Sequence, residues 1–287
     1  MFSIYLITLR KRMEHKVVVV TPVYKKDITE SELMSIKSIV NSLERYDKVV
    51  VAPKKFTNDK DFIETWKNFG YSVKFLDDKH FKDILSYNKL MLNVEFYNLF
   101  IDYDYMLICQ LDVLIFSDSL DYWISKNLDY VGAPWVVKYN NDKKFLGAGN
   151  GGLSLRKIKT FIDVLKSKQF FYKLDSFNNI PMQAKLKNII LLKILISNKI
   201  GRKFTQLFRY LFEGNEDIFW TYYATFFVQE FKVATIKDSL KFAFEEYPEF
   251  CFEQNNNTLP FGTHAWEKYN IDFWKKYQIE SIQKKNI

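Results

Sequence analysis

The chain has 287 residues, of which 48% are hydrophobic and 18% aromatic, so it has ample material for one large core. No Gly/Ser-rich, Pro-rich or periodic tract divides it, and we therefore expect residues 16–287 to form a single domain behind an N-terminal leader, residues 1–15. The net charge of +8 is compatible with nucleic acid, an anionic membrane or an anionic substrate. Because the basic residues are interspersed with acids and no nucleic-acid-binding motif accompanies them, we exclude nucleic acid as a partner.

The two cysteines and the leader bear on the cellular compartment. Cys109 and Cys251 lie far apart without a CxxC or zinc-type spacing, which predicts two buried free thiols in a reducing compartment. The leader is apolar from Phe2 to Leu9 and is followed by Arg10 to Arg12. It is too short to span a bilayer, and its charge is on the wrong side for a signal peptide. We expect a cytoplasmic protein whose leader is either poorly ordered or in contact with a membrane surface.

The first half of the chain alternates between strand and helix patterns. The β-branched run Val17–Val20 predicts a strand that is buried on both faces, as in a parallel sheet. Because the carboxyl ends of parallel strands share one edge, we expect Thr21, Pro53 and Asp112 to meet in one crevice. The pattern predicts an α/β fold with a mostly parallel central sheet flanked by helices. The other expected strands are 49–51, 73–76, 105–109 and 129–131, and the expected helices are 30–45, 62–69 and 85–100.

The alternation stops near residue 157. The pattern of residues 157–214 predicts a Lys-rich helical insert. The C-terminal third of the chain is rich in aromatic residues. Within the insert, residues 186–200 are strongly apolar, but their lysines are six residues apart and so spread around a helix. The charges exclude a transmembrane span, whereas packing on the core and a shallow membrane contact both remain open.

Two residues are candidate metal ligands. Asp112 follows a buried strand, where a carboxylate either caps the following turn or holds Mn²⁺ or Mg²⁺ against a diphosphate. His264 lies in Phe261-Gly262-Thr263-His264-Ala265-Trp266 and is either a structural histidine or a second ligand.

A second set of residues is a candidate for proton transfer. Glu216 and Asp217 follow Asn215, an expected helix N-cap, so the two acids either complement the helix dipole or supply a general base. The glycines at 147, 149, 151 and 152 match neither GxGxxG nor a Walker motif. They indicate either close backbone approach to a sugar or an ordinary turn.

Taken in order, these motifs resemble those of the GT-A glycosyltransferases, and most closely a bacterial and viral group described as a domain of unknown function. Gln110-Leu111-Asp112 stands where that family has its DxD motif, with Gln110 in place of the usual first aspartate, which weakens the case for metal dependence. The resemblance covers about residues 16–268. It rests on Thr21-Pro22-Val23-Tyr24, Tyr87-Asn88-Lys89-Leu90, Gln110-Leu111-Asp112, Tyr130-Val131-Gly132-Ala133-Pro134-Trp135, Gly149-Asn150-Gly151-Gly152-Leu153-Ser154-Leu155-Arg156, Asn215-Glu216-Asp217 and Phe261–Trp266.

The resemblance implies a role for each motif. It implies Asp217 or Glu216 as the base of an inverting reaction, and Asp112 with His264 as ligands of Mn²⁺ or Mg²⁺. It places acceptor recognition in the insert and at Trp135, Gly151, Gly152 and Trp220. The implied donor-binding residues are Thr21, Pro22, Val23, Tyr24, Pro53, Lys89, Gln110, Leu111 and Asp112.

The function expected from the sequence is therefore transfer of a sugar, hexosyltransferase-like (EC 2.4), from a nucleotide-sugar donor to a hydroxyl group of a glycan or lipid-linked acceptor. We expect a role in making lipopolysaccharide, O-antigen or another surface polysaccharide, at the inner face of the plasma membrane, where the +8 charge favours anionic lipid. Two alternatives remain open: a sugar nucleotidyltransferase, and a non-catalytic carbohydrate-binding or assembly protein on a transferase fold.

Overall fold

The computed structural model describes residues 15–140, 142–171, 174–182, 185, 188, 208 and 211–283. The predicted leader except His15, the apolar segment 186–200 except Asn188, and most of the insert after Asn179 lie outside these residues. The predictions made for those segments are not addressed by the structure.

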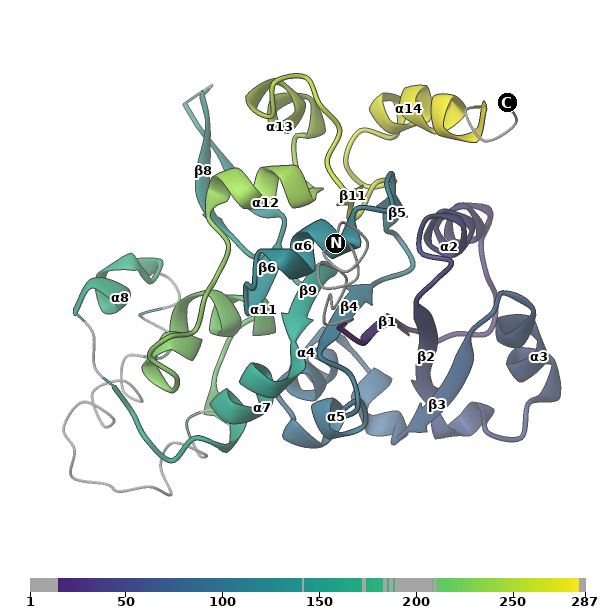
Figure 1. Cartoon of the computed structure of the whole chain (residues 1–287), viewed down its shortest axis with the longest axis horizontal. Coiled ribbons are helices and arrows are strands. Elements are labelled where there is room, and N and C mark those ends of the chain that lie inside the picture. The colour runs from purple at the N-terminus through teal and green to yellow at the C-terminus, as the bar shows by residue number, and fades with distance from the viewer. Residues whose placement is uncertain are drawn as a thin grey trace, which may run out of the picture.

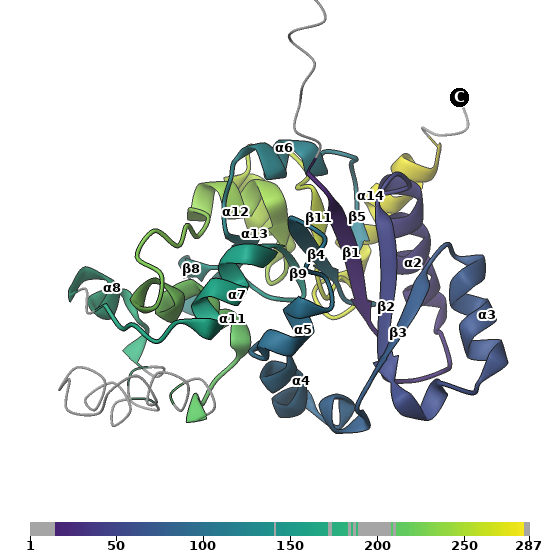
Figure 2. The ribbon, with the colours of Figure 1, turned by 60° about the horizontal axis from the view of Figure 1, so that its bottom comes forward.

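Six strands form the central sheet, in the order β3-β2-β1-β4-β9-β6 (Figures 1 and 2). The first four in this order run parallel, and β9 pairs antiparallel with both β4 and β6. The predicted α/β fold with a mostly parallel sheet flanked by helices is thus confirmed. The strands are β1 (Val17–Pro22), β2 (Asp47–Pro53), β3 (Ser72–Leu76), β4 (Tyr105–Cys109), β6 (Tyr130–Gly132) and β9 (Leu153–Lys157).

Helices cover both faces of this sheet because its strands are apolar on both sides. In β1, Val17 and Val19 belong to one buried cluster, and Val18 and Val20 belong to another. The first cluster is covered by α2 (Glu30–Ser42), α3 (Lys60–Asn68), α6 (Leu120–Ser125) and α12 (Ile236–Phe242). The second is covered by α4 (Ile84–Met91), α5 (Val94–Asn98), α7 (Ile158–Lys166) and the segment that begins with α11 (Glu216–Ile218).

The aromatic-rich C-terminal section builds a third, smaller core. A short sheet in the order β10-β11-β5 joins this section to the chain that follows β4. Trp266 and Trp274 are buried in this core, and the Trp266 indole donates a hydrogen bond to Ser35 in α2 at 3.0 Å. The elements are β5 (Leu114–Ile115), β10 (Ala243–Phe244), α13 (Pro248–Gln254), β11 (Gly262–Thr263) and α14 (Ile271–Gln283).

A two-stranded hairpin leaves the sheet between β6 and β9. It consists of β7 (Pro134–Tyr139) and β8 (Asp142–Ala148), which pair antiparallel with a bulge beside Trp135, and the glycine stretch 149–152 then leads into β9. β8 projects from the top of the molecule in Figure 1. The remaining described elements are α8 (Leu174–Asn179), the 3₁₀ turns Lys54–Phe56, Asp78–Phe81 and Ala224–Phe226, and the π-helical turn Phe219–Tyr223.

One local prediction was wrong, and the predicted N-cap was right in position only. The expected helix 85–100 is divided into α4 and α5, because the Asn93 side chain accepts a hydrogen bond from the Glu95 amide and caps a new helix. Asn215 stands at the N-cap of α11, but its side chain makes no capping hydrogen bond. Instead, the Glu216 amide donates to the side-chain oxygen of Asn88, at 3.1 Å, so a residue of α4 caps this helix.

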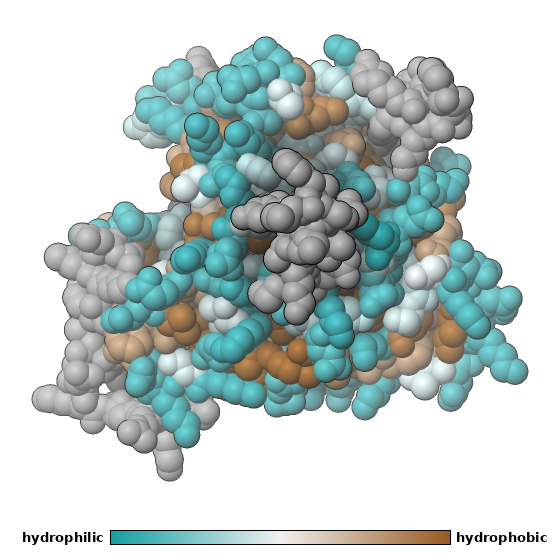
Figure 3. Space-filling model, viewed as in Figure 1, coloured by the Kyte–Doolittle hydropathy of each residue, from teal (hydrophilic) through white to brown (hydrophobic). Residues whose placement is uncertain are grey.

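Both cysteines are buried free thiols, as predicted. Where the face in Figure 3 is not grey, hydrophilic residues interrupt the hydrophobic areas. In the described part of the chain, none of the helices has the length and apolar character needed to cross a membrane.

Candidate active site

Thr21, Pro53 and Asp112 lie at or just beyond the ends of β1, β2 and β4, at the carboxyl edge of the sheet. β1 ends at Pro22, β2 at Pro53 and β4 at Cys109, and β9, running the other way, begins here at Leu153. The backbone amide of Gln110 donates a hydrogen bond to the Gly152 carbonyl at 3.0 Å. This bond holds the Gln110-Leu111-Asp112 turn beside the glycine stretch.

Asp112 and His264 face each other across this edge. Asp112 Oδ1 lies 3.3 Å from His264 Nε2, and this oxygen is buried without a hydrogen bond in the described structure. His264 Nε2 also lies 3.1 Å from Gln110 Oε1, and His264 Nδ1 lies 3.1 Å from Glu245 Oε1. The turn after β4 thus brings Gln110 and Asp112 to the His264 imidazole, and the chain after β10 brings Glu245.

The charges around His264 are strongly coupled. Burial lowers the pKa of His264, but the carboxylates of Asp112 and Glu245 outweigh it and raise that pKa to about 10. Burial raises the pKa of Asp112, but the imidazolium of His264 outweighs burial. The pKa of Asp112 is therefore below the ordinary value of an aspartate. In the absence of a metal, a proton on His264 therefore stabilises both carboxylates.

The residues present fit a divalent cation. Two ligands of one metal ion, each about 2.1 Å from it, lie about 3 Å apart, close to the separation of Asp112 Oδ1 and His264 Nε2. Glu245 on the other imidazole nitrogen would orient the ligand and keep its metal-facing nitrogen free of a proton. The described residues contain no cluster of three His, Cys, Asp or Glu side chains suited to a metal. An amide oxygen, phosphate or water would have to complete the coordination, as is common for Mg²⁺.

The glycine stretch packs directly against the polar side chains. A Cβ atom on Gly151 would collide with Glu216 Oε1, and one on Gly152 would collide with the His264 ring. These positions therefore need glycine to admit the protein's own side chains. The prediction that Gly151 and Gly152 approach an acceptor sugar is not tested by this packing and stays a prediction.

A buried ion pair fixes the start of α11. Arg156 is fully buried, and its guanidinium donates to both Glu216 oxygens at 2.7 and 3.1 Å. It also donates to the Gly151 carbonyl at 3.3 Å, to the Tyr97 hydroxyl at 3.0 Å and to Ser154 at 3.0 Å. One arginine thus connects β9, the glycine stretch, α5 and α11.

Asp217, the neighbour of Glu216, is also buried, with 8% of its surface exposed. Its carboxylate accepts a hydrogen bond from the Ile218 amide at 2.7 Å. Burial, reinforced by the negative charges of Glu216 and Glu245, raises the pKa of Asp217 to about 7. A carboxyl group with a pKa near neutrality is suited to accept and release a proton at physiological pH.

Two aromatic side chains lie on the hairpin side of the site, and burial, together with the charge of Asp217, raises the pKa of one of them, Tyr222. Trp135 and Tyr222 are half-buried, and their ring centroids are 6.0 Å apart with a 23° angle between the planes. The prediction that Trp220 contacts the acceptor is wrong for its side chain, because Trp220 is fully buried and stacks on Phe161 at 3.9 Å. The π-helical turn directs Trp220 into the core and leaves Tyr222 half-buried.

The predicted donor-binding residues divide by exposure. Tyr24 and Lys89 are exposed, and Pro22 and Gln110 are half-buried. The side chains of Thr21, Val23, Pro53 and Leu111 are buried, so any contact that they make with a ligand is through the backbone.

Three partners in the site were not identified as such from the sequence. Glu245 follows β10 and carries no motif, and Arg156 and Asn88 lie inside quoted motifs without an assigned role. A lone arginine in an apolar strand was the one available signal, because a buried cation requires a buried anion.

The chain belongs to the family described as "Protein of unknown function (DUF5672)", whose model matches residues 70–264. This range contains Asp112, the glycine stretch and Asp217, and it ends at His264. Among curated proteins, no sequence matches this chain.

Solved structures with a similar arrangement include two sugar transferases and one nucleotidyltransferase. Core-mannan synthase A from Aspergillus fumigatus, in its Mn/GDP form, has a TM-score of 0.45 and 10% identity, covering 78% of this chain and 73% of that one. The galactosyltransferase LgtC, in complex with donor and acceptor sugar analogues, has a TM-score of 0.42 and 12% identity, covering 86% of each chain. A cytidylyltransferase from Leptospira borgpetersenii has a TM-score of 0.35 and 10% identity, covering 53% of this chain and 64% of that one. All three scores are below 0.5.

Proposed function

We propose that this protein is a GT-A type glycosyltransferase that moves a sugar from a nucleotide-sugar donor to a hydroxyl group of an acceptor, with inversion at the anomeric carbon. The observation that carries the proposal is that a candidate pair of metal ligands and a candidate base lie at one edge of the sheet. One is the pair Asp112 Oδ1 and His264 Nε2, 3.3 Å apart, and the other is Asp217, with its pKa near 7.

The donor, in this proposal, lies along the ends of β1 and β2, where Pro22 and Tyr24 are accessible and Thr21, Val23 and Pro53 offer their backbone. Asp112 and His264, with the Gln110 amide oxygen beside them, would hold the metal. Mn²⁺ or Mg²⁺, when bound there, would neutralise the charge that develops on the leaving diphosphate. Lys89, exposed on α4, remains a proposed contact of the donor.

Asp217 acts as the general base in this proposal. It takes the proton of the acceptor hydroxyl while that oxygen forms a bond to the anomeric carbon, and the bond from this carbon to the diphosphate oxygen breaks. The electron pair of the broken bond leaves with the nucleoside diphosphate, so one displacement inverts the configuration. Glu216 is unsuited to this role, because both of its oxygens are held by the buried guanidinium of Arg156.

The acceptor is proposed to be a surface glycan or a lipid-linked precursor, such as those of lipopolysaccharide or O-antigen. It would approach from the hairpin side, where Trp135 and Tyr222 offer aromatic surface. The net charge of +8 supports contact with anionic lipid at the inner face of the plasma membrane, or with a phosphorylated acceptor.

A donor screen tests the proposal. The purified protein is incubated with UDP-, GDP-, CMP- and dTDP-sugars, with and without Mn²⁺, and thermal stability and nucleotide release are measured. We expect one class of donor to raise the melting temperature and to be turned over with Mn²⁺, and we expect Asp112→Ala to abolish both effects. Release of pyrophosphate would instead identify a nucleotidyltransferase. If no donor binds and Asp112→Ala changes nothing, the protein is not a transferase.

A further inference from the structure

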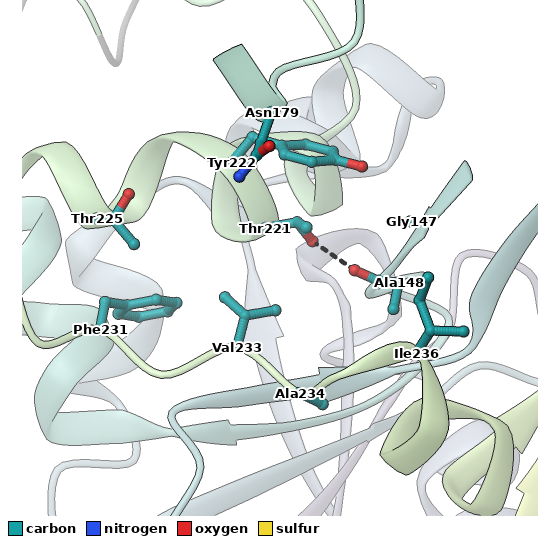
Figure 4. A pocket seen from close by; sticks show the side chains of 10 residues that line it. All are labelled: Gly147, Ala148, Asn179, Thr221, Tyr222, Thr225, Phe231, Val233, Ala234 and Ile236. Carbon is teal, nitrogen blue, oxygen red and sulfur yellow. Dashed lines mark hydrogen bonds between the residues drawn. The ribbon is translucent and has the colours of Figure 1, made fainter. Parts of the chain in front are cut away.

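A small cavity lies beside the proposed active site, next to the hairpin. It has a volume of about 270 Å³ and is walled by the end of β8, the turns that follow α11, α8 and residues 231–236 (Figure 4). This volume lies just below the roughly 300–1,000 Å³ of pockets for drug-sized ligands, so the cavity suits one ring with its substituents.

The lining of the cavity is neutral. None of the ten lining residues is charged, although 26% of the chain is. Thr221, Thr225, Tyr222 and Asn179 contribute hydroxyl and amide groups, and Val233 and Ile236 contribute apolar surface. A phosphate or carboxylate would meet no opposite charge here, whereas a neutral sugar presents hydroxyl groups for the polar residues and C–H faces for the apolar ones.

The position of the cavity relates it to the acceptor. Thr221 and Tyr222 follow Asp217 by about one helical turn, and the Thr221 hydroxyl donates to the Ala148 carbonyl at 3.1 Å, just before the glycine stretch. Val233 and Ala234 line the cavity where their segment pairs with β6, the edge strand of the sheet. The strands β1 and β2, which carry the proposed donor contacts, lie on the far side of β4.

The cavity adjoins the base without containing it. Asp217 is not among the residues that line the cavity, although the lining residue Tyr222 feels the charge of Asp217. Within the described part of the chain the Thr225 hydroxyl makes no hydrogen bond, so it is available to a ligand.

We propose that this cavity is a second carbohydrate subsite, which holds a neutral sugar residue of the acceptor next to the residue that receives the transferred sugar. The inference rests on the proposed glycosyltransferase function and makes it more specific, because the acceptor must then be at least a disaccharide.

Two variants probe the subsite. Ile236→Trp fills the cavity from its mouth, where Ile236 is 37% exposed and a larger side chain need not disturb the core. Thr225→Val keeps the shape of the side chain and removes its hydroxyl. Ile101→Trp is the matched control, since Ile101 is 58% exposed at the amino end of β4, away from the site.

The measurement compares neutral p-nitrophenyl monosaccharides and disaccharides as acceptors, with the donor found in the screen. We expect the wild-type protein to prefer disaccharides, and Ile236→Trp and Thr225→Val to lower kcat/KM for disaccharides about fivefold or more, mainly through KM. Activity on monosaccharides and hydrolysis of the donor should not change, and Ile101→Trp should behave as wild type. A wild-type protein without this preference, or variants that keep it, would overturn the subsite.

A binding experiment separates failure of the subsite from failure of the proposed function. Saturation-transfer NMR with maltose, cellobiose and lactose needs no donor and no turnover. If the protein transfers no sugar but binds one of these disaccharides, and Ile236→Trp abolishes the binding, the transferase proposal fails and the sugar site stands. If there is neither transfer nor binding, both fail.

Discussion

Glu216 and Asp217 are neighbours in sequence, but their carboxyl groups lie in opposite electrostatic surroundings. Glu216 faces the buried guanidinium of Arg156 at 2.7 Å. Asp217 is buried beside that same carboxylate, and the negative charge of Glu245 also opposes its ionisation. The two acids look alike in sequence. In the fold, Glu216 has a structural role in the ion pair with Arg156, and Asp217 is the proposed base.

The variant Asp217→Asn separates these roles. It retains the shape of the side chain but cannot take a proton, so we expect kcat to fall by about 10²- to 10⁴-fold. In the wild-type protein, kcat/KM should rise with pH to a plateau above about 7, as the carboxyl group with its raised pKa ionises. Residual activity of Asp217→Asn should lack this rise. Asp102→Asn, an exposed change before β4, is the control. An unchanged pH profile in Asp217→Asn would assign the base to another group.

Glu245 offers a test of the proposed metal ligands Asp112 and His264 that leaves both residues in place. The carboxylate lies 3.1 Å from His264 Nδ1 and would orient the imidazole. We expect Glu245→Gln to weaken Mn²⁺ binding about 10- to 100-fold, as measured by calorimetric titration. Glu246→Gln is a matched control, because Glu246 accepts its hydrogen bond from Tyr269. Equal Mn²⁺ affinity in the two variants would show that Glu245 does not support a metal ligand.

At the scale of the elements, Arg156 is the common point of β9, α5 and α11. Removing one partner of a buried ion pair leaves the other charge unpaired, so we expect Arg156→Met to lower the free energy of unfolding by about 3–5 kcal/mol. The double variant Arg156→Met/Glu216→Leu should recover most of this loss, because it removes both charges. Denaturant unfolding is measured for the wild type, the single variants Arg156→Met and Glu216→Leu, and the double variant. If the two single losses simply add in the double variant, the pair is not coupled.

Periodicity and composition predicted the elements that are defined by local sequence. β1 to β4 and the helices between them follow from β-branched runs and helical spacing, and this order places Asp112 at a strand end. The break at Asn93 comes from a local capping hydrogen bond, which the hydrophobic pattern does not register. The capping of α11 by Asn88 and the pairing of β5 with β11 depend on contacts between distant residues. Periodicity alone could not show these contacts.

The same division explains how much of the site the sequence could reveal. Asp112, His264 and Asp217 stand in motifs, whereas Glu245 has no local signal and reaches His264 only through the β10–β11 pairing. Trp220 and Tyr222 are both aromatic and two residues apart. Which of them lines the cavity depends on the π-helical turn, which shifts the register of side chains along the helix.

Across the whole molecule, the site is assembled from segments that are distant in the chain, so its electrostatics affect the stability of the entire fold. The native state keeps a proton on Asp217 up to about pH 7, whereas the unfolded chain releases it near pH 4. Stability contributed by the protonated form is therefore present below pH 4 and is lost as the pH rises through 7.

Because of this linkage, the difference in unfolding free energy between Asp217→Asn and the wild type should depend on pH. Asp217→Asn carries no charge at this position at any pH, so its stability relative to the wild type should increase as the pH rises from 4 to 8. The shift corresponds to at most about 4 kcal/mol. Urea unfolding at pH 4 and pH 8 measures it, and the titrating groups that do not interact with Asp217 cancel between the two proteins. A pH-independent difference would mean that the pKa of Asp217 is not raised in the folded state.

The hairpin between β6 and β9 has a consequence for how such a protein can diversify. The chain leaves the sheet at Gly132 and returns at Leu153, and these two points lie at the same edge on neighbouring strands. The fifteen-residue ribbon of β7, its turn and β8 can therefore be lengthened, shortened or exchanged without changing the order of any strand. Residues on this ribbon border the cavity, whereas Asp112, His264 and Asp217 lie outside it. If the proposed function holds, exchange of one ribbon between relatives is a route to new acceptor preferences that leaves the proposed reacting groups in place.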